Sequence, residues 1–214
     1  DSFLKYYSKD QKRPKEKKTR AFQIRRKKKD GNHLHVHESV VSVKEVLKRS
    51  RELGVSMTVF LTAVFLKAIH EEMSKMQEKK PIVLMVPVNL RKFFPSTSML
   101  NFFNWIEPGY DFSKRDRSFE EVLRYTKDFF EEQLTKEKMS AHINDLLALE
   151  LHPILRLAPL ELTNLCIHAG AKFSEKNTTA IFSNMSAVRM PDSYVPYIER
   201  FGVFTNTPKL ELCL

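Results

Sequence analysis

The feature that most constrains this chain is a short apolar run that ends abruptly in polar residues. Every residue from Ile82 to Val88 is apolar, and most of them are β-branched. Such a run predicts a strand that is buried on both faces. Asn89 and Arg91 follow at once, so the strand delivers an amide and a guanidinium to the edge of a core. A guanidinium in that position typically binds an anion or holds a carboxylate from another segment.

Several other stretches have the character of strands or helices. Ser42 with Glu45, and Ser118 with Glu121, show the Ser-x-x-Glu spacing of a helical capping box. We predict strands at residues 34–40, 102–106, 178–182, 201–205 and 210–214, and helices at 43–53, 56–73, 119–134, 140–152 and from 159 onward. The second helix begins after Ser56 and is apolar nearly all round, so we expect it in the core. Because strands and helices interleave, the fold class is α/β, a layered sandwich with a mixed β-sheet flanked by helices.

The net charge of +10 is confined to one end of the chain. Residues 1–29 contain 13 Lys and Arg against 3 Asp and Glu, whereas residues 30–214 contain 23 of each. We therefore divide the chain into a basic linker arm at 1–32 and a folded, electrically neutral part at 33–214. The arm is interpreted either as a solvated linker or as a patch for phosphate or an anionic membrane surface. No nucleic-acid-binding motif accompanies it, so nucleic acid is not expected as a partner.

Cysteines and histidines give no clear catalytic or metal-binding pattern. Cys166 and Cys213 are isolated, which fits a reducing cytoplasm, and we predict a cytoplasmic protein. His33, His35 and His37 alternate on one face of a predicted strand, a spacing that suits a metal but that simple strand alternation also produces. No carboxylate or cysteine cluster accompanies them, so no metal site is assigned. We expect no transmembrane segment, because the most apolar stretch is far shorter than a bilayer requires.

The first strand and its successor resemble the CoA-dependent acyltransferase superfamily. That superfamily includes chloramphenicol acetyltransferase, the condensation domains of nonribosomal peptide synthetases and alcohol acetyltransferases. Pro87-Val88-Asn89-Leu90-Arg91 is similar to the Pro-Val-x-x-Arg signature of condensation domains. The stretch 101–104 resembles the Gly-Phe-Phe-Val-Asn-like strand that follows it, with Asn101 in place of the glycine. The resemblance covers roughly residues 34–150 and resumes at 178–201, and it implies one lobe, the C-terminal one, of the chloramphenicol acetyltransferase-like fold.

The resemblance also implies roles for particular residues. In the family, an arginine pairs with the aspartate of the catalytic motif, so Arg91 is implied as a structural support of the active site, with Asn89 beside it. Ser183-Asn184-Met185-Ser186 resembles a Ser-Asn-x-Gly turn near the substrate tunnel, with Ser186 where glycine is usual. A hydroxyl or amide there can donate a hydrogen bond to a developing oxyanion. The implied tunnel residues are Asn101, Phe102, Asn104, Ser183 and Asn184.

The family's catalytic motif, His-His-x-x-x-Asp, has no counterpart here, because the sequence contains no adjacent pair of histidines. No catalytic residue is therefore assigned, and we expect the chain to be inactive alone. The prediction is a C-terminal lobe of a protein that transfers an acyl group from a thioester, acyl-CoA or phosphopantetheine, to a hydroxyl or amine. The thioester is a co-substrate, and no cofactor is expected to be bound permanently.

The expected partners are the N-terminal catalytic lobe of the same protein, a small-molecule acyl acceptor and a carrier protein. The alternative is a non-catalytic, degenerate relative that acts as a binding or scaffold module. The departures from glycine at Asn101 and Ser186 favour that alternative slightly.

Overall fold

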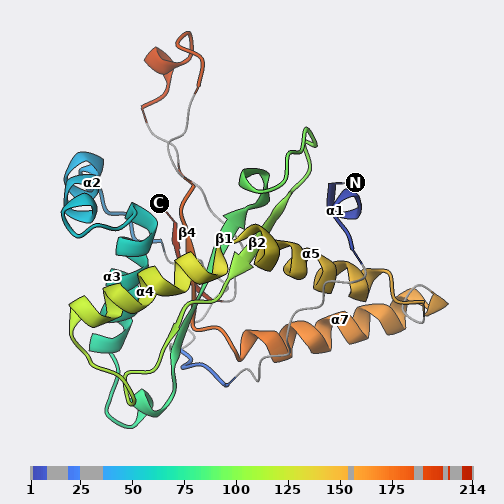
Figure 1. The fold of residues 1–214 in the computed structure, drawn as a ribbon, viewed down its shortest axis with the longest axis horizontal. Coiled ribbons are helices and arrows are strands. Elements are labelled where there is room, and N and C mark those ends of the chain that lie inside the picture. Colours follow the sequence, from blue (N-terminus) through green and yellow to red (C-terminus); the bar gives the residue numbers. More distant parts are fainter. Residues whose placement is uncertain are drawn as a thin grey trace.

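Five strands form one mixed sheet with helices packed against it (Figure 1). The computed structural model describes residues 2–8, 19–24, 36–153, 157–185, 190–199, 202 and 209–213. The interleaving of helices and strands in the sequence is what builds the layers. The predicted α/β layered sandwich with a mixed sheet is therefore confirmed.

The sheet has the order β2-β1-β4-β5, and β3 also pairs with β1. Its strands are β1 (Ile82–Asn89), β2 (Phe103–Ile106), β3 (Gly109–Tyr110), β4 (Ala180–Ser183) and β5 (Leu210–Cys213). β2 and β3 run antiparallel to β1, whereas β4 runs parallel to β1 and β5 parallel to β4. β1 is therefore the central strand, as its apolar sequence suggests. The strand predicted at 201–205 falls almost wholly outside the described residues.

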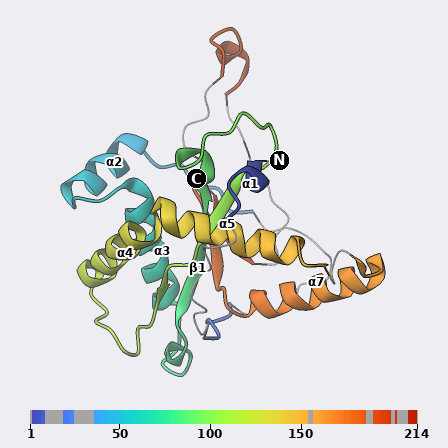
Figure 2. The same cartoon turned by 45° about the vertical axis from the view of Figure 1, so that its right-hand side comes forward.

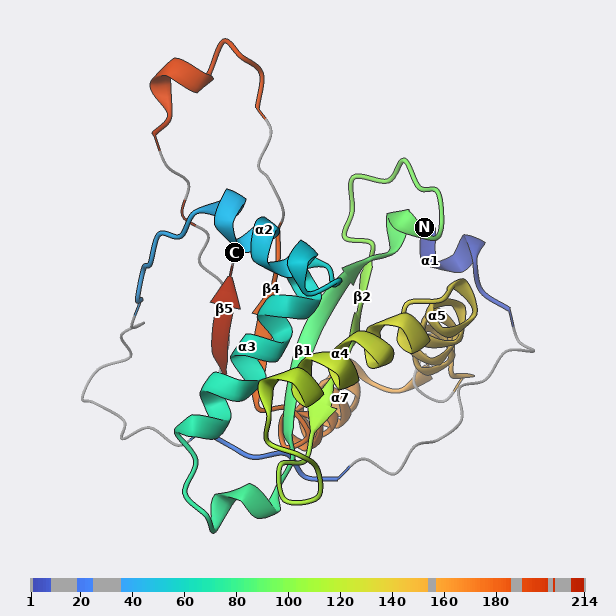
Figure 3. The same ribbon diagram turned by 60° about the vertical axis from the view of Figure 1, so that its left-hand side comes forward.

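β1 is buried on one face only, so the prediction of burial on both faces is wrong. Ile82, Leu84 and Val86 are buried, whereas the alternate residues Val83 and Met85 are half-buried. The helices α3 (Met57–Glu71) and α4 (Phe119–Gln133) cover the first of these faces (Figure 3). The run is apolar throughout, but in the described part of the chain fewer residues pack against the face that carries Val83 and Met85.

The starts of two consecutive helices form as predicted. α2 (Val43–Glu52) begins at Ser42, whose hydroxyl accepts a hydrogen bond from the amide of Glu45 at 3.4 Å. Gly54 ends this helix with a φ of +66°, the left-handed conformation that glycine adopts without strain. Ser56 then caps α3 by accepting from the amide of Val59 at 3.3 Å. These caps set the sharp turn between the two helices.

Other local predictions are wrong. α5 (Lys136–Glu150) begins before Ser140, because Thr135 caps it by accepting from the amide of Lys138 at 3.2 Å. Ser118 does precede α4, but its hydroxyl bonds to the carboxylate of Asp116 at 2.7 Å instead of capping the helix. Residues 36–40 are exposed and form no strand.

The described parts of the predicted basic arm pack against the folded body. The ring of Phe3, in α1 (Ser2–Lys5), lies 4.9 Å from that of Phe102, centroid to centroid. The amide of Phe22 donates to the carbonyl of Pro81 at 2.8 Å, and its side chain is in the core. These apolar residues therefore anchor segments that the charge pattern alone assigns to a linker. The boundary at residue 32 stays a prediction.

The last long helices, α5 and α7 (Leu160–Glu175), lie beside each other at one side of the molecule (Figure 2). α7 starts just after Pro159, as predicted. Among the described residues no single helix is long and apolar enough to cross a bilayer. Taken together, α2 and α3 reach the required length and apolar composition, but the chain bends by 91° between them.

Candidate functional site

The carboxyl end of β1 lies between two of the predicted tunnel asparagines. Val88 of β1 is paired directly with Asn104 of β2. On its other side β1 pairs with β4 in the parallel register Leu84 with Ala180 and Met85 with Ile181. Continued along the strands, this register brings Asn184 level with Val88. The sheet thus gathers residues that are far apart in the sequence around one strand end.

Asn104 is fully buried, with a relative exposure of 0%. Its Oδ1 accepts a hydrogen bond from the amide of Trp105 at 2.8 Å. Its Nδ2 has no hydrogen-bond partner among the described residues. A buried donor left without an acceptor costs stability.

Asn184 contacts the first turn of α3. Its Nδ2 donates to the hydroxyl of Thr58 at 3.1 Å, and the backbone carbonyl of Thr58 accepts from the Thr62 hydroxyl at 2.7 Å. This bond ties the end of β4 to the start of the central helix. Thr58 was not among the predicted site residues. The only signal for it in the sequence is its place two residues after the helix cap Ser56.

Ser183 lies on the opposite face of the sheet from Asn184, because side chains alternate along a strand. It is paired with Cys213 on β5, whose thiol donates to the Glu211 carboxylate at 3.4 Å. Burial and the nearby carboxylate raise the pKa of the Cys213 thiol. The thiol is therefore neutral at physiological pH and is not an activated nucleophile.

Asn89 and Arg91 brace the loop that follows β1. The Oδ1 of Asn89 accepts from the amide of Arg91 at 3.0 Å and so caps the 3₁₀ turn Leu90–Lys92. The Nη2 of Arg91 donates to the carbonyls of Ser98 at 2.7 Å and Leu100 at 2.8 Å. Its other guanidinium nitrogens have no partner in the described part of the chain, and the side chain is exposed. Pairing with a catalytic-motif aspartate stays a prediction.

The remaining predicted tunnel residues line neither of two hollows found among the described residues. Asn101 is exposed, whereas Phe102 is 1% exposed and packs against Phe3 and Tyr6. Two shallow hollows occur elsewhere: one of about 550 Å³ between α2, α3 and α4, and one of about 570 Å³ along α2. The tunnel role of the predicted residues stays a prediction. His33, His35 and Ser186 lie outside the described residues.

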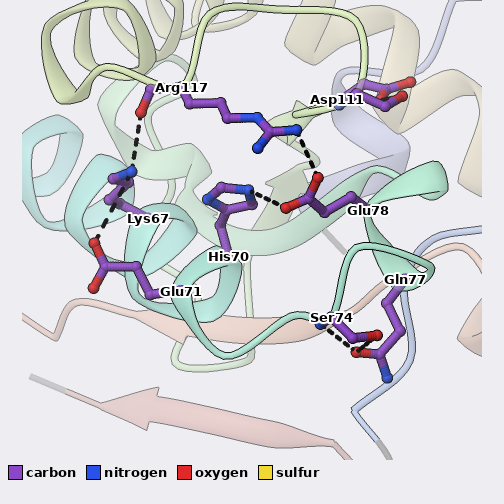
Figure 4. A network of polar contacts seen from close by, with 9 residues as sticks. Lys67, His70, Glu71, Ser74, Gln77, Glu78, Asp111 and Arg117 are labelled. Atoms are coloured by element: carbon purple, nitrogen blue, oxygen red, sulfur yellow. Dashed lines mark hydrogen bonds and ion pairs between the residues drawn. The ribbon is translucent and has the colours of Figure 1, made fainter.

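A second polar network lies at the other end of α3 (Figure 4). The imidazole of His70 stacks on the Phe112 ring, with 3.8 Å between centroids, and its Nε2 lies 3.2 Å from a Glu78 oxygen. Arg117 binds the other Glu78 oxygen at 2.7 Å, and Lys67 donates to the Arg117 carbonyl at 3.0 Å. Burial lowers the pKa of His70.

His70 is twelve residues from Thr58 along α3, about 18 Å at 1.5 Å per residue. The network joins the end of α3 to the turn after it and to the loop before α4. We interpret it as structural. No group of His, Cys, Asp and Glu that could hold a metal occurs in the described ranges.

Comparison with known proteins gives a match to a family model. Residues 2–104 match the family model described as alcohol acetyltransferase. No curated protein and no solved structure matches the chain. The matched range includes both motifs at the end of β1, from Pro87 to Arg91 and from Asn101 to Asn104. Residues 2–104 are therefore similar to the alcohol acetyltransferase family, a part of the CoA-dependent acyltransferase superfamily, in agreement with the resemblance seen in the sequence.

Proposed function

We propose that the chain takes part in the transfer of an acyl group from a thioester to a hydroxyl or amine. The donor class is acyl-CoA or a phosphopantetheine-bound acyl group. The observation that carries the proposal is the alcohol acetyltransferase match, whose range contains the strand end where Val88 pairs with Asn104. Both sequence motifs of the superfamily thus meet at one place in the sheet.

The side chains at the end of β1 are suited to positioning a substrate or a loop, and not to transferring a proton. They are the amides of Asn104 and Asn184, the Thr58 hydroxyl and the Arg91 guanidinium. None of these is a base at neutral pH, and attack by an alcohol on a thioester requires one. We therefore assign the base to a His-His-x-x-x-Asp segment outside these 214 residues, the expected catalytic lobe. The Asn104 amide has a donor without a described partner, but it is fully buried, so we assign it to the support of this strand end.

Arg91 has a part in this arrangement. Its Nη2 holds the backbone of the loop at Ser98 and Leu100, which fixes the direction of the guanidinium. The remaining nitrogens are left to bind the aspartate of the catalytic motif in a charge-assisted pair. In this proposal the arginine is a positioning residue that joins the two lobes.

The test is an assay of free thiol released from acetyl-CoA in the presence of a primary alcohol. It compares the chain alone with the chain joined to the segment encoded before Asp1. We expect turnover only in the joined protein, and a strong loss on Arg91→Ala but not on the adjacent Lys92→Ala. A preceding segment without the histidine motif, or no turnover with an intact one, contradicts the proposal.

A non-catalytic binding role is the second candidate. Two departures in the sequence favour it, since Asn101 and Ser186 stand where the family motifs have glycine. This candidate expects the joined protein to bind an acyl carrier protein without any thiol release. Turnover in the assay above rejects it.

A further inference from the structure

α7 is an apolar helix that the rest of the described chain leaves almost uncovered (Figure 2). Every α7 side chain that the structure describes is exposed, apart from that of Thr163, which is half-buried. By contrast α4, which is one residue shorter, buries five side chains. A helix of this length is only marginally stable by itself in water, and in proteins it gains most of its stability by packing an apolar face. α7 is therefore the first place to look for contact with another protein surface.

One face of α7 carries an apolar centre between two opposite charges. Leu162, Leu165 and Ala169 are spaced i, i+3 and i+7, so they lie along the same side of the helix. The two leucines are 52% and 66% exposed. Glu161 and Lys172 lie on this side too, because their separation of eleven residues is close to three full turns. We call these five residues the α7 face.

The charges at the two ends of the α7 face are complementary to each other. Neither Glu161 nor Lys172 forms an ion pair or a side-chain hydrogen bond with a residue that the structure describes. If a copy of the helix is turned end for end about the midpoint between these two residues, its Lys172 falls opposite Glu161 and its Glu161 opposite Lys172. A parallel copy instead places like charges together. The α7 face therefore matches itself in charge, and it does so in the antiparallel direction.

We propose that the α7 face is a contact between two copies of this chain, whose α7 helices pack side by side and antiparallel. Each Glu161 then pairs with Lys172 of the partner subunit, and the leucines of both copies leave water. The helix dipoles favour the same direction, since the positive end of each helix lies beside the negative end of the other. A different protein needs a matching charge pattern of its own, whereas a second copy supplies one by symmetry.

This contact is small, and it is independent of whether the chain takes part in acyl transfer. A single pair of helices buries less surface than a permanent dimer does, so we expect a weak dimer. The dissociation constant should be on the order of 10–100 µM. Sedimentation velocity of the chain from about 1 µM to about 300 µM should then show a monomer at the low end and mostly dimer at the high end.

Two substitutions on opposite sides of α7 identify the face that makes the contact. Leu165→Ser should weaken the dimer by about 20-fold, because the change removes apolar area in both copies. Ile167→Ser is the matched control, since Ile167 is 59% exposed and lies about 200° further round the helix. It should leave the dissociation constant within about twofold of the unaltered chain. Both residues are exposed, so circular dichroism should show the same helix content in each variant.

Reversal of either charge tests the antiparallel direction. Glu161→Lys and Lys172→Glu should each weaken the dimer by about tenfold, since each change turns both ion pairs of the symmetric contact into like-charge pairs. An equimolar mixture of the two variants should associate as the unaltered chain does, because the mixed pair has opposite charges at both ends. Unchanged association of both single variants contradicts the antiparallel contact.

Three other outcomes overturn the proposal. The first is a chain that stays monomeric up to about 300 µM. The second is an equal loss of association in Leu165→Ser and Ile167→Ser, which means that the dimer does not use the α7 face. The third is a dimer of the chain alone that disappears when the chain is joined to the segment encoded before Asp1, because that segment and not a second copy then covers the α7 face.

Discussion

Asn184 and Thr58 are 126 positions apart in the sequence and are joined by a hydrogen bond of 3.1 Å from the Asn184 amide to the Thr58 hydroxyl. The bond connects the first residue after β4 to the first turn of the helix that covers β1. It therefore fixes one side of the candidate site at the end of β1. On the opposite side, Asn104 is fixed by its strand pairing with Val88.

Replacement of Thr58 by Val should remove this connection with little change in shape. We expect the free energy of unfolding to fall by about 0.5–1 kcal/mol, the net value of one hydrogen bond that is partly open to water. Urea denaturation followed by circular dichroism measures the change. Thr163→Val is the matched control, because the Thr163 hydroxyl bonds only within the start of its own helix, at 3.2 Å to Pro159. An equal loss in both variants argues against a specific role for the contact with Asn184.

Replacement of Asn104 by Leu should change the free energy of unfolding little but lower the turnover of acetyl-CoA strongly. The change removes the Asn104 Nδ2, a buried donor that has no acceptor among the described residues. It also removes the Oδ1, which accepts a hydrogen bond of 2.8 Å from the Trp105 amide. These effects oppose each other, so we expect the free energy of unfolding to change by less than about 1 kcal/mol. In the joined protein of the acetyl-CoA assay, the same variant should lose most of its turnover. A large loss of stability instead indicates that Asn104 is a structural residue.

Replacement of Arg91 by Ala should release the loop from Phe93 to Leu100. Without the two bonds to Ser98 and Leu100, the amides of this loop should exchange hydrogen roughly tenfold faster, while the amides of β1 keep their protection. Hydrogen exchange read by mass spectrometry resolves the two segments. Lys92→Ala serves as the control, because Lys92 has the same charge and no described side-chain partner. Unchanged exchange in the loop contradicts the bracing role.

Local sequence signals predicted the elements whose ends are set by neighbouring residues. The serines before α2 and α3 accept bonds from amides three residues ahead, and this interaction needs no tertiary context. Ser140 had an equally plausible pattern, but Thr135 caps the helix first and Ser140 falls inside it. Ser118 failed for another reason, since the carboxylate of Asp116 competes for its hydroxyl.

The candidate site was only partly accessible from the sequence. Asn104 and Asn184 carried recognisable motifs, and the sheet brings both to the end of β1. Thr58 carried none, because its role arises from a contact between segments that are distant in the chain. Phe102 was assigned to a tunnel from its motif, but in the described structure it packs against Phe3, a residue of the arm. Burial on one face of β1 instead of two likewise depends on which helices cover the sheet.

The last prediction concerns the dependence of stability on pH through His70. Burial lowers the pKa of this imidazole in the folded protein, despite the opposing effect of Glu78, while Lys67 and Arg117 lower it further. Below about pH 6.5 the unfolded chain therefore binds a proton that the folded chain does not, so stability falls as the pH falls toward the folded pKa. His70→Phe keeps the stack on Phe112 and removes this proton.

We expect the melting temperature of the His70→Phe variant to decline less than that of the unaltered chain between about pH 7.5 and about pH 5.5. His152→Gln, at an exposed histidine, is the control and should keep the original decline. A steeper decline in the phenylalanine variant means that the folded state gains a proton at His70. In that case the attraction of Glu78, 3.2 Å from the ring, outweighs burial and the network is an ion pair at acidic pH.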